Sequence, residues 1–112
     1  MEFTDAFGAW WGDLSVDEQE AISDRVDMLA EHGPALKRPY VGKIESSRHA
    51  HMKELIVEEG AASIRVLFAF DPRRAAILLI GGDKAGNWRR WCVEYVPIAD
   101  DLYDEHLTEI NE

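Results

Sequence analysis

Apolar side chains recur every three or four residues over the first third of the chain, which is the spacing of one helix face. This spacing predicts a short helix over residues 5–13 and a longer helix that starts near residue 16. Ser15 and Glu18 form a capping-box pattern at that start. Gly33-Pro34 ends the helix, because glycine favours the left-handed cap and proline cannot continue a helix. The apolar positions that support the two helices are Phe7, Trp10, Trp11, Leu14, Ile22, Val26 and Leu29.

After a loop around residues 34–39 the apolar pattern changes to a period of two, which is typical of strands. The predicted strands are 2–4, 53–58, 63–71 and 75–80. In the clearest of them the alternating apolar residues are Ile64, Val66, Phe68 and Phe70. If these side chains lie under the two helices, Arg65 points to the opposite face of the sheet.

Beyond the last strand, residues 81–87 are predicted to leave the sheet, because the segment is rich in glycine. The chain then looks helical from Trp88 to about Glu109, with an interruption expected near Pro97. The side chains expected to face inward from this helix are Ile98, Leu102, Tyr103 and Leu107.

The order of these elements predicts an α+β fold. We expect two N-terminal helices packed on one face of a small, mainly antiparallel sheet, plus a C-terminal helix. A chain of 112 residues with 46% hydrophobic composition suits a single domain over 1–112. The sequence shows no apolar run of the roughly 20 residues that a membrane span needs, and its acidic start lacks the features of a signal peptide. We therefore expect a cytoplasmic protein that does not contact a membrane.

Charge is distributed unevenly along the chain. Residues 1–31 carry nine acidic side chains against one basic side chain, and residues 94–112 carry seven acidic and no Lys or Arg. Residues 32–93 carry eleven Lys and Arg against six acidic side chains, within a chain whose net charge is −10. A local cationic field attracts phosphates or carboxylates and steers partners into place.

The predicted sheet suggests where these cations gather. Arg65 would lie on an uncovered face of the sheet, with the other basic side chains along the rim of one concave surface. Those side chains are Lys53, Arg73, Arg74, Lys84, Arg89 and Arg90. The alternative is that they are solvated turn and edge residues, since charged edges discourage aggregation between strands.

Other chemistry finds little support in the sequence. His49 and His51 with the single Cys92 do not supply the four ligands of structural zinc, so no metal site is predicted. Residues 81–86 are glycine-rich but lack the Gly-Lys-Ser/Thr ending of a nucleotide-binding loop. His49 and His51 have an intrinsic pKa suited to a general base, although a solvated loop histidine is the commoner outcome. The sequence therefore predicts no cofactor.

Four segments resemble one known family. They are Met52-Lys53-Glu54-Leu55, Ile64-Arg65-Val66-Leu67-Phe68-Ala69-Phe70, Ile77-Leu78-Leu79-Ile80-Gly81-Gly82-Asp83-Lys84 and Ile98-Ala99-Asp100-Asp101-Leu102-Tyr103. In this order they are similar to the RelE/HigB toxins of bacterial type II toxin–antitoxin systems, and most similar to the phage Gp49-like HigB branch. The fold of that family has the element order predicted above.

The resemblance implies an endoribonuclease, an mRNA interferase that cleaves translated mRNA on the ribosome without a metal ion. A ribose 2′-OH attacks the adjacent phosphate, which requires a base, an acid and cations around the phosphoryl oxygens. The resemblance points to Arg65, Lys84 and Lys53 as catalytic residues. The candidates for RNA binding are Arg73, Arg74, Trp88, Arg89, Arg90 and His51.

The resemblance also implies a partner, an antitoxin of the helix-turn-helix HigA type. The toxin is expected to contact DNA only through this antitoxin. We expect the antitoxin to cover the cationic face or to lock the helices. The exposed aromatic side chains near Phe7 are explained better by core packing than by this contact.

The sequence departs from the family pattern at Glu54, where active relatives tend to place further positive charge. A C-terminal proton donor is also not assigned among Trp88, Trp91, Tyr95, Tyr103 and His106. An alternative function therefore stays open. The chain would be a toxin of the RelE/ParE fold, or an inactive relative, that acts by binding a protein such as gyrase without cleaving RNA.

Overall fold

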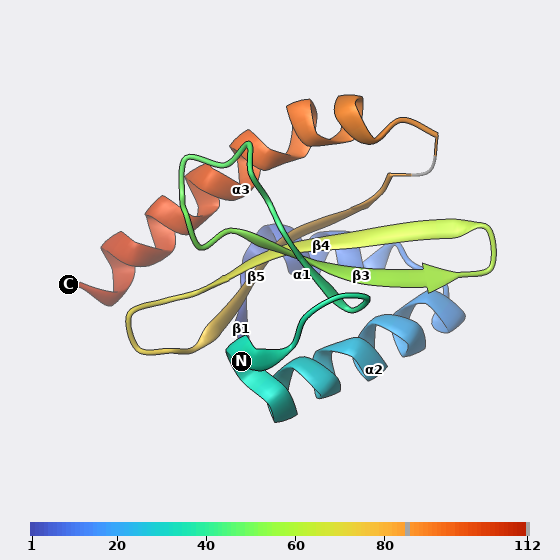
Figure 1. The fold of residues 1–112 in the computed structure, drawn as a ribbon, viewed down its shortest axis with the longest axis horizontal. Coiled ribbons are helices and arrows are strands. Elements are labelled where there is room, and N and C mark those ends of the chain that lie inside the picture. The colour runs from blue at the N-terminus through green and yellow to red at the C-terminus, as the bar shows by residue number, and fades with distance from the viewer. Residues whose placement is uncertain (85, 112) are drawn as a thin grey trace.

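The chain folds into a five-stranded sheet with helices on both faces (Figure 1). This computed structural model describes residues 1–84 and 86–111, except for the side chain of Trp88. In chain order the elements are β1 (Glu2–Phe3), α1 (Asp5–Gly12), α2 (Val16–His32), a 3-10 turn (Gly33–Ala35), β2 (Val41–Lys43), β3 (Lys53–Glu59), β4 (Ala62–Phe70), β5 (Ala76–Asp83) and α3 (Trp88–Ile110).

The strands lie in the order β1-β5-β4-β3-β2. β1 pairs with β5 in parallel, and every other pair is antiparallel, so the predicted mainly antiparallel sheet is confirmed. β2 was not predicted, because its three residues are too few to show an alternating pattern. It forms one edge of the sheet beside β3, and β1 forms the other edge.

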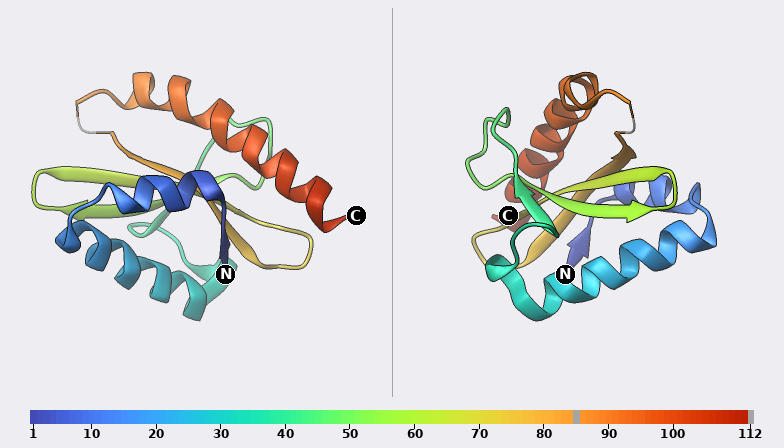
Figure 2. Two further views of the ribbon diagram at one scale, coloured as in Figure 1. Left: turned by 180° about the vertical axis from the view of Figure 1, so that it is seen from behind. Right: turned by 45° about the vertical axis from the view of Figure 1, so that its right-hand side comes forward.

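The two faces of the sheet carry separate hydrophobic cores. α1 and α2 contribute Phe7, Ile22 and Leu29 to the first core, together with the alternating side chains of β4. α3 contributes Trp91, Val96, Ala99 and Tyr103 to the second core. Figure 2 shows α3 on the opposite side of the sheet from α2. The α+β fold class is confirmed, but the expectation of an uncovered face behind Arg65 is wrong, because α3 covers that face.

The helix boundaries follow the capping signals of the sequence. Thr4 caps α1, and its hydroxyl accepts a hydrogen bond from the Phe7 N–H while donating one of 2.6 Å to the Leu79 carbonyl. The predicted capping box of Ser15 and Glu18 is present at the start of α2. Gly33 ends this helix with φ of 58°, a conformation that glycine adopts without steric cost.

Two predictions about the second half of the chain are wrong. β5 continues to Asp83 instead of ending at residue 80. Gly81 and Gly82 are part of this strand, and each lies against a tryptophan. A Cβ at Gly81 would lie 2.3 Å from the Trp10 ring of α1, and a Cβ at Gly82 would lie 2.6 Å from Trp91 Nε1 of α3. The two helices can pack this closely because the glycines have no side chain. α3 is also continuous through Pro97.

The inward face of α3 is partly as expected. Tyr103 is buried, and Leu102 and Leu107 pack against the second core. Ile98 is 40% exposed, which corrects its predicted inward position. Among the described residues, no helix is both long and apolar enough to cross a membrane.

Candidate functional site

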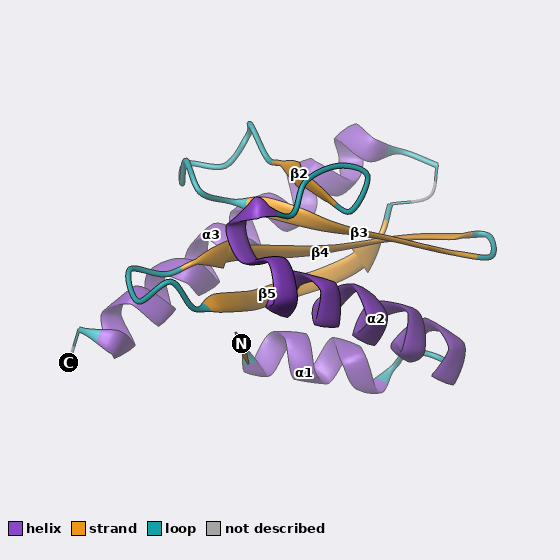
Figure 3. Cartoon of the chain, turned by 60° about the horizontal axis from the view of Figure 1, so that its bottom comes forward, coloured by secondary structure: helices purple, strands orange, loops and turns teal. Residues whose placement is uncertain are grey.

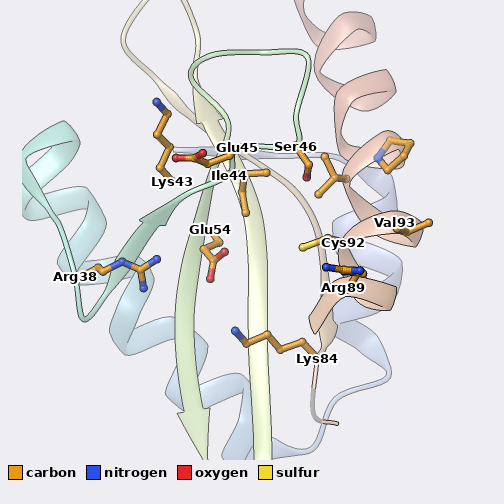
Figure 4. A pocket seen from close by; sticks show the side chains of 12 residues that line it. Arg38, Lys43, Ile44, Glu45, Ser46, Glu54, Lys84, Arg89, Cys92 and Val93 are labelled. Carbon is orange, nitrogen blue, oxygen red and sulfur yellow. The ribbon is translucent and has the colours of Figure 1, made fainter. Parts of the chain in front are cut away.

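A groove of about 790 Å³ lies between the β2–β3 edge of the sheet and the first half of α3. We call it the cationic groove (Figure 4). Its lining residues are Arg38, Lys43, Ile44, Glu45, Ser46, Glu54, Lys84, Arg89, Cys92, Val93, Val96 and Pro97. Four of these residues are basic and two are acidic.

Glu54 lies at the centre of the cationic groove and is buried (Figure 4). Its neighbours across the sheet are Gly42 on β2 and Leu67 on β4, and Leu67 belongs to the core beneath α3. Paired residues of adjacent strands share a face, so Glu54 points toward α3.

The absence of a side chain at Gly42 brings Arg38 next to Glu54. A Cβ at Gly42 would lie 2.9 Å from Arg38 Nη2 and 3.4 Å from Glu54 Cγ. The Arg38 guanidinium thus occupies the space over the Gly42 backbone. Figure 4 shows it extending toward Glu54.

Arg65 lies beneath the groove instead of lining it. Its side chain is 7% exposed, its Nε donates to Glu54 Oε1 at 3.0 Å, and its Nη2 pairs with Glu58 Oε1 at 3.1 Å. Its Nη1 donates to the Ile64 carbonyl and to the Ser63 hydroxyl. The expectation that Arg65 is solvent-accessible is therefore wrong, because α3 covers its face and two carboxylates occupy its guanidinium.

Lys84 lies directly after β5, and its backbone N–H donates to the Ser63 carbonyl at 2.9 Å. Its side chain reaches into the cationic groove below Glu54 (Figure 4). Burial lowers the pKa of the Lys84 ammonium from its usual value, and the nearby charge of Arg65 lowers it further, against opposing effects of Glu54 and Glu58.

Arg89 and Arg90 lie in the first turn of α3, and both are exposed. Arg89 lines the cationic groove on the α3 side. The backbone N–H of Arg90 donates to the capping Asn87 side chain at 3.0 Å. Trp88 was a further candidate for RNA binding, but its side chain lies outside the described residues.

Lys53 and His51 lie in a second, adjacent groove of about 570 Å³. Lys53 is paired across the sheet with Phe68, which belongs to the core under α1 and α2. Its side chain therefore leaves β3 on the opposite face from Glu54, and the structure does not bring Lys53 together with Lys84. Arg38 and Lys43 line both grooves and connect them, and Lys37 adds a further cation to the second.

Arg73 and Arg74 lie in the β4–β5 turn, at the far end of the sheet from Lys84. The length of β4 between Ser63 and the turn is about 23 Å at strand spacing. Arg73 Nη2 pairs with Asp71 Oδ2 at 2.7 Å and with Glu2 Oε2 at 2.5 Å. The expectation that these two arginines line the same surface as Lys84 is wrong, because the two ends of β4 separate them.

Asp71, Glu2 and His106 each bring one possible ligand atom within 4.8 Å of the others. His106 Nε2 lies 2.9 Å from Asp71 Oδ2. Burial raises the pKa of Asp71, but hydrogen bonds from Arg73, from His106 and from the backbone N–H of Ala75 together outweigh it and hold that pKa well below its usual range. Arg73 already neutralises two of the three groups, so we interpret the cluster as an ion-pair network that joins α3 to the β4–β5 turn.

The loop between β2 and β3 is fastened to α3. The Ser47 hydroxyl donates to Asp100 at 2.5 Å, and His49 Nε2 lies 2.8 Å from Asp104 Oδ1. Arg48 pairs with Asp101 and Asp104. These contacts hold the loop that forms one wall of the cationic groove, and they occupy the histidine that was considered as a base.

Sequence reasoning missed Arg38, Lys43 and Glu54 as members of the site. The alternation of β3 contained a signal for Glu54, because it places Glu54 on the face of Leu67 and Lys53 on the other face. Arg38 and Lys43 could not be placed, since β2 was not predicted.

Known proteins resemble this chain over most of its length. The family described as "Phage derived protein Gp49-like (DUF891)" matches residues 9–104. A protein of Mycobacterium tuberculosis (strain ATCC 25618 / H37Rv) named "Putative toxin HigB3" is 50% identical over 98 residues, which cover 88% of this chain and 84% of that protein.

A second protein of the same strain, named "Putative toxin HigB2", is 41% identical over 105 residues. The match covers 93% of this chain and 52% of that protein, so the chain spans about half the length of this relative. No solved structure matches the chain.

Proposed function

We propose that this chain, which belongs to the phage-derived Gp49-like family and is a HigB-type toxin of a toxin–antitoxin system, is an endoribonuclease. Its proposed substrate is translated mRNA. The observation that carries this proposal is the cationic groove. Arg38, Lys84 and Arg89 come from three separate segments and surround one buried carboxylate, Glu54. Cations of this number in one groove suit a phosphodiester, and a carboxylate among them suits a proton acceptor.

Glu54 is the proposed base and Lys84 the proposed acid. Glu54 accepts the proton of the ribose 2′-OH, and the 2′-oxygen then forms a bond to phosphorus while the bond from phosphorus to the 5′-oxygen breaks. Lys84 donates a proton to the departing 5′-oxygen. The products are a 2′,3′-cyclic phosphate and a free 5′-OH, and transfer of one proton from Glu54 to Lys84 restores both groups.

The lowered pKa of Lys84 supports its role, because an ammonium that loses its proton more readily is a better general acid near neutral pH. Arg38 and Arg89 bind the phosphoryl oxygens, since a planar guanidinium matches two oxygens of one phosphate.

Arg65 is a positioning residue in this proposal. Its Nε donates to Glu54 Oε1 at 3.0 Å, and this fixed charge keeps the Glu54 carboxylate in one orientation at the centre of the cationic groove. This role replaces the direct phosphate contact expected from the sequence, because Glu54 and Glu58 already occupy the guanidinium.

The second groove extends the proposed RNA path. Lys43 lines both grooves, and His51 and Lys53 lie beyond it. A single strand whose cleaved phosphate lies near Glu54 would continue along these side chains. Phosphate contacts of this kind add affinity without reading sequence.

An antitoxin is the partner that the family implies, and we propose that it is of the HigA helix-turn-helix type and that the pair acts in the cytoplasm. The chain carries a net charge of −10, so its approach to ribosomal RNA depends on presenting the cationic groove.

A second candidate function is toxicity through binding a protein, such as gyrase, without RNA cleavage. The neutralisation of Arg65 by Glu54 and Glu58 favours it, because a buried ion pair removes one cation from the RNA surface.

Mapping of transcript ends after induced expression, with and without the antitoxin, separates the two functions. New ends carrying a 5′-OH within coding regions support the nuclease. Growth arrest with intact transcripts and stalled DNA replication supports the protein-binding alternative.

A further inference from the structure

An aromatic side chain stands exposed at the edge of the sheet that is opposite to the cationic groove. Phe3 on β1 is 64% exposed, although its ring lies 5.8 Å from the ring of Phe7. Burying such a side chain contributes about 1.5–3 kcal/mol. A single exposed apolar residue is ordinary on a protein surface, so Phe3 is informative because it also lines an apolar groove.

Phe3 lines an apolar groove of about 230 Å³ between α1 and α2. Trp11 and Val26 form its walls from the two helices, and Leu78 of β5 forms its floor. Figure 3 shows α1 and α2 lying side by side. The remaining lining residues are Phe7, Gly8, Ser23 and Asp27.

The surroundings of Phe3 are acidic. Asp27 lies in the apolar groove itself. On the other side of Phe3 a second hollow is lined by Glu2, Asp5, Glu105 and Glu109. Arg73 pairs with Glu2, so the other four carboxylates, which come from α1, α2 and α3, supply the acidic surroundings of this exposed aromatic ring. A surface of this kind repels RNA and anionic lipid headgroups.

A second copy of the chain is also a poor occupant. A two-fold contact through Phe3 would place the same carboxylates of both copies against each other. The chemistry that fits is a large apolar side chain flanked by lysine or arginine, because it fills the groove and pairs with the acidic rim.

We propose that the α1–α2 groove is the docking site of the antitoxin, which inserts an amphipathic segment bearing large apolar residues flanked by Lys or Arg. This inference rests on the proposed pairing of the chain with an antitoxin. β1 and β2 are the two edges of the sheet, so the strand that carries Phe3 lies four strand spacings, about 19 Å, from β2 beside the cationic groove.

The test is a calorimetric titration of the full-length chain with the purified antitoxin encoded beside it. Phe3→Ala and Asp27→Lys should each weaken binding at least tenfold. Asp24→Lys is the matched control, because it makes the same charge change on the opposite flank of α2, where Asp24 lines a different hollow. Binding by Asp24→Lys should stay within twofold of the unaltered chain.

Unchanged binding by both Phe3→Ala and Asp27→Lys would overturn the proposal. Loss of binding in Lys84→Ala with Phe3→Ala unaffected would also overturn it and would place the antitoxin on the cationic groove. If the unaltered chain is a dimer and Phe3→Ala makes it a monomer, the groove holds a second copy and the proposal fails.

The titration is independent of RNA cleavage. A chain that leaves transcripts intact but binds the antitoxin through Phe3 would refute the nuclease alone. Because Phe3 also contacts Phe7, thermal unfolding of Phe3→Ala checks that the fold persists, and the exposed Asp27→Lys provides a second variant that leaves the aromatic contact in place.

Discussion

Glu54 and Arg65 form a buried ion pair on the face of the sheet that α3 covers. Their side chains are 4% and 7% exposed, and Arg65 Nε lies 3.0 Å from Glu54 Oε1. Burial of two charges is costly, so such a pair contributes less to stability than its geometry suggests, while removal of one partner leaves an uncompensated charge. The pair therefore has separable effects on stability and on the chemistry of the cationic groove.

Glu54→Ala should lower the free energy of unfolding by about 3–5 kcal/mol, because Arg65 is left buried without that carboxylate. Urea unfolding measures this loss. Glu58→Ala is the matched control, since the Glu58 side chain is 59% exposed, and its loss should cost under about 1 kcal/mol. The double variant Glu54→Leu with Arg65→Met should recover most of the stability without activity. Equal losses for Glu54→Ala and Glu58→Ala would contradict this account of the pair.

Lys84→Ala should reduce the rate of RNA cleavage by roughly 10²–10⁴-fold, which is the usual contribution of a general acid. Lys84→Arg separates proton donation from charge. Arginine keeps the cation but does not release a proton, so a general acid predicts that Lys84→Arg is as inactive as Lys84→Ala. Cleavage of a short oligonucleotide provides the measurement, and near-normal activity of Lys84→Arg would reduce Lys84 to a phosphate ligand.

The same assignment predicts a pH dependence. The ammonium must be protonated to act as an acid, so the rate should fall as pH rises through the pKa of Lys84. Burial and Arg65 lower that pKa, and the fall should therefore begin below the 10.5 of an ordinary lysine. A pH series of cleavage rates would show it. A rate that stays constant up to pH 10.5 would argue against Lys84 as the donor.

Most of the fold could be predicted from the sequence because its elements are local. The helix starts are set by capping groups such as Ser15 with Glu18, and β4 shows a clear alternation over nine residues. β2 was missed because three residues carry no period. The continuation of β5 through Gly81 and Gly82 was missed for a different reason. Those glycines admit Trp10 and Trp91 from opposite faces, and contacts between distant segments leave no local pattern.

The candidate site was predicted less well than the fold, for reasons of placement. Spacing assigned Arg65 to the correct face of the sheet, but it could not show that α3 covers that face. Arg73 and Lys84 were grouped because both follow strands, whereas an antiparallel pair places the two turns at opposite ends. The participation of Arg38 depends on a missing side chain at Gly42, which requires the register of β2 on β3.

RNA affinity should depend on the connected grooves and be insensitive to the far turn. Arg38→Ala and Lys43→Ala should each weaken binding of a single-stranded RNA and lower the salt dependence of log Kd by about 0.7 per lost phosphate contact. Arg74→Ala is the control, because Arg74 is an exposed arginine in the β4–β5 turn and its removal makes the same charge change. Fluorescence anisotropy at several salt concentrations measures the slopes. Equal effects of Arg74→Ala and Arg38→Ala would indicate unspecific attraction by net charge.

Acid should destabilise the junction between α3 and the β4–β5 turn through Asp71. Its pKa in the folded chain is held well below its unfolded value by Arg73 and His106, so the folded state binds fewer protons than the unfolded state. The stabilisation is complete above the unfolded pKa of about 4 and is lost as pH falls below it. Asp71→Asn should lower the free energy of unfolding by roughly 3 kcal/mol at pH 7. It should also make that free energy depend less on pH between pH 5 and about 2.

Chemical unfolding at a series of pH values measures that curve, with Asp101→Asn as the control. Asp101 lies on the same helix that Asp71 anchors, and its side chain is 74% exposed. Asp101→Asn should therefore change the free energy of unfolding by less than about 1 kcal/mol. The loss of stability between pH 5 and about 2 should stay as it is in the unaltered chain. If Asp71→Asn keeps the full acid dependence, other carboxylates produce it, and the contacts of Asp71 with Arg73 and His106 contribute little to holding α3 against the sheet.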